Sequence, residues 1–148
     1  MDTLGYNEGD FIFPSHRKEV ILLNIILSAD RTCDLTQELC DSFDVHTIPY
    51  HIELEGKDYQ DSVNILPEDL YRAWWDRKQL PRTSAINVEE YVAYFKPWVD
   101  VGYEVVHFCL GSALSSSYRN CCLAAQELGG HVHPVDSHSL STGTGLQV

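Results

Sequence analysis

The sequence predicts an α/β fold in which a mainly parallel sheet is flanked by helices. Residues 20–28 are apolar and β-branched at several positions, as buried parallel strands are; residues 103–110 predict a second buried strand, and residues 131–137 predict a third strand. Between them, apolar residues recur at helical spacing, so strand and helix alternate along the chain. The 148 residues are 44% hydrophobic, which suffices for one compact core. We expect an N-terminal arm at residues 1–19 and one domain at residues 20–148.

The first strand is followed by signals for a helix and a hairpin. Asp34 is predicted to cap the helix, because its apolar residues then fall on one face, namely Leu35, Leu39, Cys40 and Phe43. Further along, Glu55 and Gly56 separate two extended pieces. This pair predicts a tight hairpin turn.

Two helices are predicted in the middle of the chain. Pro67 is expected at the first position of a helix whose inward face carries Leu70, Tyr71, Trp74 and Trp75. Asn87 is predicted to cap the next helix, with Glu90 completing a partial capping box. Pro97 is expected to break or kink this helix before Gly102 ends it.

The last third of the chain repeats the alternation. A helix is predicted at residues 113–128, directly after the second strand, and Gly129 and Gly130 close it. The third strand follows, and a further helix begins in the final residues, 141–148.

Charge and cysteine content disfavour several classes of protein. Ten Lys and Arg against 22 Asp and Glu give a net charge of −12, which repels nucleic acid and anionic membrane surfaces. The long apolar run at residues 20–28 is too short to span a bilayer. Acidic residues precede this run, where a signal peptide has positive charge. The five cysteines contain no C-x-x-C pair, so we predict reduced thiols in a cytoplasmic protein.

Four serines occupy residues 112–117, where the second strand meets the next helix. Ligands of α/β folds bind at such carboxyl ends of strands, and free amides at a helix start favour an anion. Ser112 adds a hydroxyl donor, while Gly111 lets the backbone turn closely. No Lys or Arg lies between Val105 and Tyr118, so a carboxylate on an apolar tail fits better than a polyphosphate.

Two other interpretations of these serines remain open. Ser112 or Ser115 would serve equally as an ordinary helix cap without a ligand. Ser112 as a nucleophile is the third interpretation, although the G-x-S-x-G elbow is absent around it.

Other polar groups have a functional and a structural interpretation. Thr83 and Ser84 are adjacent hydroxyls in a predicted loop and are also common turn formers. Asp30 and Asp34 could act as an acid and base pair. In the structural interpretation, Asp30 is a strand-end residue that ties down loops, and Asp34 is a helix cap. A metal site is conceivable at residues 131–138, from His131, His133, Asp136 and His138, but we expect a polar strand end and no metal.

Five segments resemble, in order and spacing, successive blocks of the bacterial DegV-like fatty-acid-binding proteins. They are ILSADRTCDL, GKDYQDSVNILPEDLY, LPRTSAINVEEY, LGSALSSSY and VDSHSLSTGTGL. The resemblance implies that residues 20–148 are the N-terminal α/β domain of a two-domain DegV-like fold, whose C-terminal half is absent here. It also implies a protein that buries one long-chain fatty acid without a cofactor. Such proteins present the acid to a separate fatty acid kinase and are not themselves catalytic.

The resemblance also assigns roles to residues. It implies that Thr83 and Ser112 bind the fatty acid carboxylate, with Ser84 and the backbone near Ala113 in secondary roles. The chain departs from the family pattern at several places, where Arg31, Ala85–Ile86–Asn87, Gly111, Ser116 and Ser117 replace other residues. The alternative functions are a small serine-dependent hydrolase or transferase, with Asp30 or His138 assisting Ser112, and an interaction module without a ligand.

Overall fold

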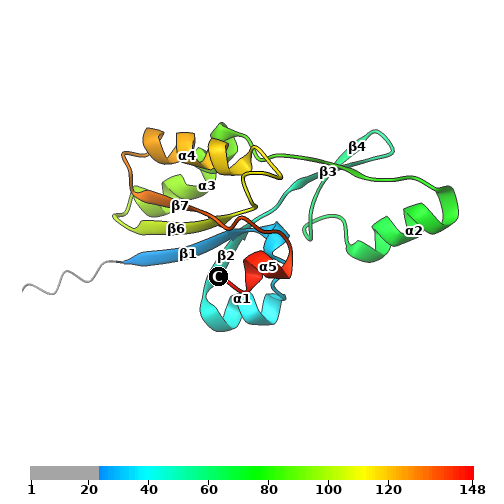
Figure 1. Cartoon of the computed structure of the whole chain (residues 1–148), viewed down its shortest axis with the longest axis horizontal. Helices are drawn as coiled ribbons and strands as arrows, with labels where there is room; N and C mark the ends of the chain where they lie inside the picture. Colours follow the sequence, from blue (N-terminus) through cyan, green and yellow to red (C-terminus); the bar gives the residue numbers. More distant parts are fainter. Residues whose placement is uncertain (1–23) are drawn as a thin grey trace, which may run out of the picture.

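The computed structural model describes residues 24–148, which form two sheets and their helices (Figure 1). The main sheet is parallel and has the strand order β2-β1-β6-β7. Its strands are β1 (Ile25–Asp30), β2 (Val45–Ile48), β6 (Glu104–Cys109) and β7 (Val132–Asp136). This confirms the predicted mainly parallel sheet. The first strand was predicted at residues 20–28, and the structure has it at Ile25–Asp30. Residues 20–23 of that prediction and the predicted arm at residues 1–19 lie outside the described residues.

Helices lie on both sides of the main sheet (Figure 1). On one side, α3 (Val88–Val99) and α4 (Ser117–Glu127) pack against each other and cover β6 and β7. On the other side lie α1 (Gln37–Phe43), the short 3-10 helix η1 (Arg31–Cys33) and α5 (Thr142–Gly145). The largest fully buried side chains of the main core are Tyr91, Phe95, Ile86 and Val105.

A second sheet with the order β4-β3-β5 forms a small lobe with α2 (Pro67–Arg77). Its strands are β3 (His51–Leu54), β4 (Lys57–Gln60) and β5 (Arg82–Ser84), and both pairings are antiparallel. The predicted hairpin joins β3 to β4, and Glu55 and Gly56 have positive φ angles of 55° and 73°. Positive φ at both central residues is the geometry of a type I′ turn, and the predicted hairpin is confirmed.

The cap of the first helix was assigned to the wrong residue. The side chain of Thr36 accepts the amide of Leu39 at 3.3 Å and caps α1. Asp34 instead adopts the left-handed conformation at the end of η1, with a φ of 55°. An extra turn between strand and helix therefore displaces the start of the helix by two residues.

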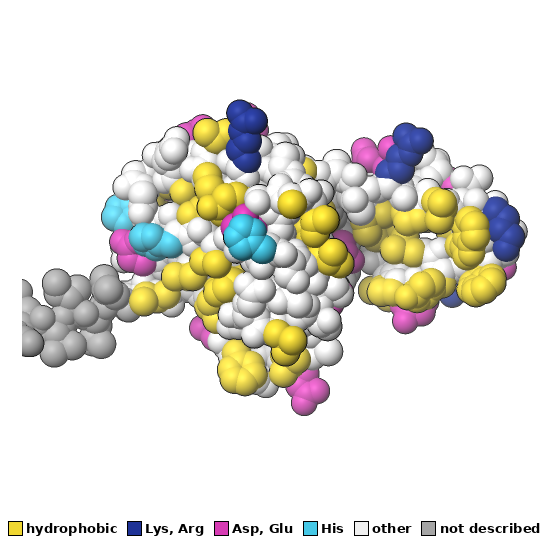
Figure 2. Space-filling view, in the orientation of Figure 1, with side chains coloured by type: hydrophobic (Ala, Val, Ile, Leu, Met, Phe, Trp, Pro, Cys, Tyr) yellow, Lys and Arg dark blue, Asp and Glu magenta, His cyan; other side chains and the backbone are white. Residues whose placement is uncertain are grey.

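Of the inward face predicted for α2, Leu70 is confirmed, whereas Tyr71, Trp74 and Trp75 are exposed. Ala73 is the buried residue of this helix, and Leu70 packs beside it against the small core formed by Ile52, Leu54 and Ile65. Tyr71 and Trp75 are 66% and 69% exposed, and Trp74 is 40% exposed. Hydrophobic side chains consequently lie open on this lobe (Figure 2). The three-stranded sheet is narrow and covers only a thin stripe of the helix.

In the next two helices, the predicted cap of α3 is confirmed, whereas the predicted break at Pro97 and the predicted start of α4 are not. Asn87 and Glu90 form the predicted capping box of α3, with the two reciprocal bonds both at 2.9 Å. Pro97 does not break the helix, which continues to Val99 because a proline near the C-terminus removes only one late hydrogen bond. The helix α4 begins at Ser117 rather than at residue 113.

Candidate functional site

The strands β1, β6 and β7 end side by side, and their following loops meet at the carboxyl edge of the main sheet (Figure 1). One of these loops is the serine turn, which we define as residues 111–116 between β6 and α4. The loop after β7 packs against it. This edge is the place where ligands bind in parallel α/β folds.

Close contact between the two loops explains Gly111. Its amide donates to the carbonyl of Ser139 at 2.8 Å. A Cβ atom on Gly111 would lie 2.8 Å from the amide nitrogen of Ser139, which is closer than carbon and nitrogen atoms pack. The predicted close turn at this glycine is therefore confirmed, and its cause is the approach of a second loop.

The serine turn is a separate turn and not the first turn of α4. The amides of Leu114 and Ser115 both donate to the carbonyl of Gly111, at 2.8 and 3.3 Å. Ser115 does not cap the helix at its boundary, but its hydroxyl accepts the amide of Ser117 at 3.1 Å. Ser112 thus lies five residues before the helix, and the predicted contribution of the helix N-terminus does not reach it.

Some backbone donors of the turn stay available within the described residues, among them the amide of Ala113. The amide of Ser112 donates to Oδ1 of Asp136 at 3.0 Å. Within residues 24–148, the amide of Ala113 makes no hydrogen bond. Ser112 and Ala113 are both exposed, so a ligand can reach the Ser112 hydroxyl and the Ala113 amide together.

Asp136 sets the charge of this edge. Desolvation raises the pKa of its carboxyl, but hydrogen bonds from Ser112 and from the amide of His138 outweigh this and hold the pKa below its ordinary value. Asp136 is therefore ionised at neutral pH and stands next to Ser112. An anionic ligand at Ser112 is repelled from this side and approaches most easily from the side of Ala113.

Thr83 and Ser84 lie in the small lobe, on a strand that the sequence did not predict. They belong to β5 and pair with Ile52 and His51 of β3. Both are exposed. Among the described residues, no hydrogen bond links this strand to the serine turn. The four predicted ligand residues therefore lie in two places, with Ser112 and Ala113 in the serine turn and Thr83 and Ser84 on β5. Contact of both pairs with one carboxylate stays a prediction.

Two grooves border the same edge. The first has a volume of about 470 Å³ and a mainly apolar lining, formed by Leu27, Cys33, Asp34, Leu35, Leu39, Phe43, Val45, Thr142, Gly145, Leu146 and Val148. The second, of about 430 Å³, is lined by Thr32, Asp34, Asp61, Leu110, Leu114, Leu140 and Ser141. Two carboxylates border the second groove, so it disfavours a carboxylate head group. Three of the four apolar residues predicted on one helix face, Leu35, Leu39 and Phe43, line the first groove, and Leu39 and Phe43 are exposed, whereas Cys40 is buried.

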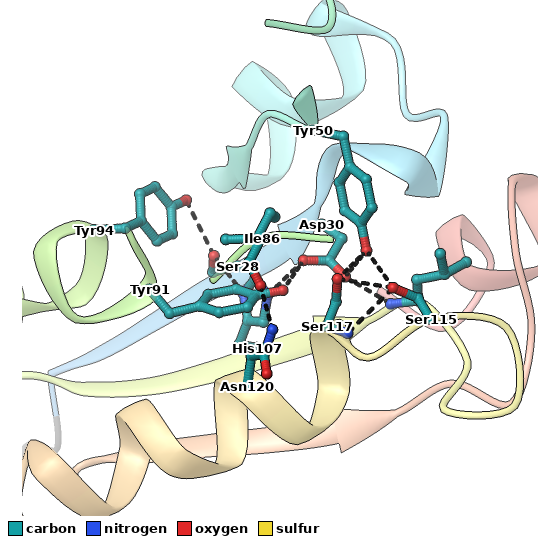
Figure 3. Close-up of polar contacts among 11 residues, drawn as sticks. Ser28, Asp30, Tyr50, Ile86, Tyr91, Tyr94, His107, Ser115, Ser117 and Asn120 are labelled. Carbon is teal, nitrogen blue, oxygen red and sulfur yellow. Dashed lines mark hydrogen bonds and ion pairs between the residues drawn. The ribbon is translucent and has the colours of Figure 1, made fainter. Parts of the chain in front are cut away.

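A fully buried carboxylate lies directly beneath the serine turn (Figure 3). Oδ1 of Asp30 accepts hydrogen bonds from the Tyr91 hydroxyl at 2.6 Å and from Nε2 of His107 at 3.2 Å. Oδ2 accepts the amide of Leu110, the residue before the turn, at 2.8 Å. A buried charge requires such partners, so this arrangement fixes the ends of β1 and β6 together. The prediction that Asp30 ties down loops is confirmed by the bond to Leu110.

The electrostatics of this cluster keep its donors protonated. Burial alone lowers the pKa of His107, but hydrogen bonds to Asp30 and Cys109 outweigh it and raise the pKa to about 9. Burial, and to a lesser extent the negative charge of Asp30, raises the pKa of Tyr50 to about 12. The same two causes also raise the pKa of Tyr91. Burial also raises the pKa of Tyr94 to about 12.

Sequence reasoning missed most of this cluster. Ser28 and His107 are single polar residues inside apolar strand segments, and both are fully buried. Nδ1 of His107 lies 2.9 Å from the Ser28 hydroxyl, which lies 3.1 Å from the Tyr94 hydroxyl. A polar residue inside a buried strand needs a partner, and that signal was present in the sequence.

The alternative chemical sites are not assembled as such. His131 and His133 bind the two carboxylate oxygens of Glu104, at 2.7 and 2.8 Å, which fits a polar strand end. His138 contacts Asp136 at 3.2 Å, and the carboxylate of Asp136 accepts the Ser112 amide. Asp30 is buried and engaged and cannot assist Ser112.

A buried group of His107, Cys109 and Cys121 has its ligand atoms within 4.8 Å of one another. Both ring nitrogens of His107 already face Asp30 and Ser28. A metal ion there would have to displace one of these bonds.

Within the part of the chain that the structure describes, no helix is long and apolar enough to cross a membrane.

Comparison with known proteins identifies the family. The chain matches the model of a family described as "Uncharacterised protein, DegV family" over residues 24–148. A DegV domain-containing protein of Deinococcus radiodurans is 32% identical over 126 residues, which are 85% of this chain and 45% of that protein. A DegV domain-containing protein of Clostridium perfringens is 28% identical over 123 residues, which are 82% of this chain and 44% of that protein. The chain therefore spans less than half the length of these relatives.

Solved structures share the fold. One, described as fatty acid binding of a DegV family protein from Thermus thermophilus, superposes with a TM-score of 0.76 at 28% identity, over 84% of this chain and 44% of that chain. A stearic acid-binding protein from Eubacterium ventriosum gives a TM-score of 0.73 at 28% identity, with the same coverage. The family match spans every residue that the structure describes, and the resemblance seen in the sequence is confirmed: the chain belongs to the DegV family.

Proposed function

We propose that this chain binds a long-chain fatty acid as part of a carrier protein that is not itself catalytic. The observation that carries the proposal is that two solved DegV structures, both 28% identical to this chain, are described as fatty-acid-binding. The chain covers 44% of each of these structures, so fatty acid binding by a whole protein that contains this chain is part of the proposal.

The head group of the acid would be held by uncharged donors. We assign the carboxylate to the hydroxyls of Thr83 and Ser112, with Ser84 and the free amide of Ala113 as secondary donors. Their exposure makes them accessible to a ligand, and the absence of a hydrogen bond on the Ala113 amide within residues 24–148 supports its role. An unpaired amide gains more from an anion than an amide that already has an acceptor.

The tail would supply most of the affinity. Burying one methylene group contributes about 0.8 kcal/mol, and a hydrogen bond to a charged group contributes about 1.5–3 kcal/mol. A chain of sixteen carbons therefore gains several times more from its tail than from its head group. We infer that affinity depends on apolar surface while Thr83 and Ser112 orient the carboxylate.

We further propose that the carrier acts in the cytoplasm and presents the carboxylate to a separate fatty acid kinase. Exposure of Ser112 and Ala113 supports presentation, because a partner enzyme must reach the head group. The neighbour of Ser112 is the carboxylate of Asp136, whereas a nucleophilic serine needs a base such as histidine in contact with its hydroxyl. This arrangement favours a carrier over a serine-dependent hydrolase or transferase.

The experiment uses the full-length protein, meaning the product of the whole reading frame that contains these residues. Binding of a long-chain fatty acid and of the matching fatty alcohol is measured by calorimetry for the wild type, for T83A/S112A and for S116A. Ser116 is an exposed serine of the same turn and serves as the matched control. We expect the double variant to lose about ten-fold or more in acid affinity and to keep its alcohol affinity. Unchanged acid affinity would reject the assigned roles, and burst labelling of Ser112 by an activated ester would favour the hydrolase.

A further inference from the structure

The main sheet and the small lobe are joined by two short crossings of the chain. The first, residues 49–50, leads from β2 to β3, and the second, residues 85–87, leads from β5 to α3. Thr83 and Ser84 stand directly before the second crossing. The crossings therefore determine where the Thr83 side of the candidate site lies relative to the serine turn.

Each crossing is bound to the segment that ends the serine turn and begins α4 (Figure 3). In the first crossing, the Tyr50 hydroxyl bonds to the Ser117 hydroxyl at 2.5 Å and lies 3.5 Å from the Ser115 hydroxyl. In the second crossing, the carbonyl of Ile86 accepts the side-chain amide of Asn120 at 2.7 Å. Tyr50 and Ile86 are 4% and 1% exposed, so water does not compete for either tie.

Tyr50 also reaches the main sheet. Its hydroxyl lies 3.4 Å from Oδ2 of Asp30, the same oxygen that accepts the Leu110 amide. Asp30 thus holds the residue before the serine turn, while Tyr50 holds its end through Ser115 and Ser117. The two ends of the turn are connected through one buried carboxylate and one phenol.

The Tyr50 hydroxyl is suited to this task. Burial and the charge of Asp30 raise its pKa to about 12, so it keeps its proton at neutral pH. Its ring fills the main core and belongs to the same cluster as Tyr91 and Phe95. Replacement by phenylalanine would keep the ring packing and remove only the bonds to the turn and to Asp30.

From this geometry we propose that Tyr50 is a positioning residue that fixes the serine turn relative to the Thr83 strand and so sets recognition of a carboxylate head group. The effect on ligand recognition rests on the proposed function, because it requires that the protein bind a fatty acid. The claim that Tyr50 holds the serine turn in place does not depend on any ligand. Tyr50 does not touch the ligand in this account. It acts through Ser115 and Ser117 on the spacing of the donors at Ser112 and Thr83.

The test compares Y50F with Y94F in the full-length protein. Tyr94 is a partly buried tyrosine whose hydroxyl bonds to the buried Ser28 hydroxyl at 3.1 Å rather than to the serine turn, so Y94F controls for the loss of a tyrosine hydroxyl that hydrogen-bonds inside the protein. We expect Y50F to bind a long-chain fatty acid about five-fold more weakly and the matching fatty alcohol equally well. Y94F is expected to leave the ratio of acid to alcohol affinity unchanged. An equal loss for acid and alcohol in Y50F, or the same acid-specific loss in Y94F, would overturn the proposal.

Hydrogen exchange of the ligand-free protein separates this inference from the proposed function. We expect the amides of Leu114, Ser115 and Ser117 to exchange about five-fold faster in Y50F than in the wild type, and to be unaffected in Y94F. If the wild type binds no fatty acid, the proposed function fails, and exchange still decides whether Tyr50 holds the turn. Unchanged exchange in Y50F would refute the positioning role whatever the ligand.

Discussion

The amide of Ser112 donates a hydrogen bond to Oδ1 of Asp136 across 3.0 Å, which places a carboxylate beside the hydroxyl assigned to the ligand. The bond orients the serine turn, because Asp136 ends β7 and belongs to the rigid main sheet. The same bond brings a negative charge close to an anionic head group. Asp136 therefore fixes the position of the serine turn and at the same time repels a carboxylate ligand.

Replacing Asp136 by asparagine is expected to strengthen binding of a fatty acid. An asparagine oxygen still accepts the Ser112 amide, while the charge is removed. A repulsion of about 1 kcal/mol, as between unit charges about 4 Å apart in a water-like environment, corresponds to about five-fold in affinity. Calorimetry with acid and alcohol measures the effect, which should appear for the acid alone. D100N is the control for net charge, because Asp100 precedes β6 at the opposite edge of the sheet. Equal or weaker acid binding by D136N would contradict the account.

A methyl group at Gly111 is expected to destabilise the protein. Its Cβ would meet the backbone of Ser139 at 2.8 Å, and neither loop is a flexible side chain that can move aside. We expect G111A to lower the free energy of unfolding by about 1–3 kcal/mol. Urea denaturation followed by circular dichroism gives the value. S116T adds a methyl group at an exposed position of the same turn and should change stability by less than about 0.5 kcal/mol. Similar stability of G111A and the wild type would show that the loops are not in contact.

Stability should fall at alkaline pH because of His107. Its folded-state pKa is raised from 6.5 to about 9, so the folded protein binds this proton more tightly than the unfolded chain. The resulting stabilisation is fully present below pH 6.5 and is lost as the pH rises through about 9. Its size is about 3 kcal/mol, since each pKa unit corresponds to about 1.4 kcal/mol.

Urea denaturation between pH 6 and pH 9.5 checks this expectation. His107 is enclosed by Asp30, Ser28 and Cys109 and by the ring of Tyr91, and Asp30 supplies the charge that holds the proton. H133Q is the control, because His133 is exposed and bonds to Glu104 at the surface. A wild-type unfolding free energy that stays constant over this range would show that folding does not raise the pKa of His107.

Local signals in the sequence predicted the elements whose pattern is strong. The Asn87 and Glu90 capping box and the Glu55–Gly56 turn follow from spacing within a few residues, the parallel sheet follows from the alternation of strand and helix, and all are present. The strand at Arg82–Ser84 was missed because three polar residues carry no alternation. It forms through pairing with β3, thirty residues earlier, which a local pattern cannot indicate.

The candidate site was predictable only in part. The serine turn at a strand end was visible from composition, and so was the need for Gly111. The Asp30 cluster was not, because Tyr91, His107 and Leu110 come from 61, 77 and 80 residues away in the chain. Likewise, the contact of Asp136 with Ser112 joins residues 24 positions apart and changes the electrostatics of the site. Long-range pairing of polar groups depends on the register of the sheet.

Native mass spectrometry of the gently desalted full-length protein tests most directly whether a fatty acid is bound. The Thermus thermophilus relative, prepared in the same way, serves as the positive control. We predict one long-chain fatty acid per protein molecule, released on denaturation and identified by its mass. A protein that carries no fatty acid and takes up none when it is supplied, while the control retains its ligand, would contradict the account.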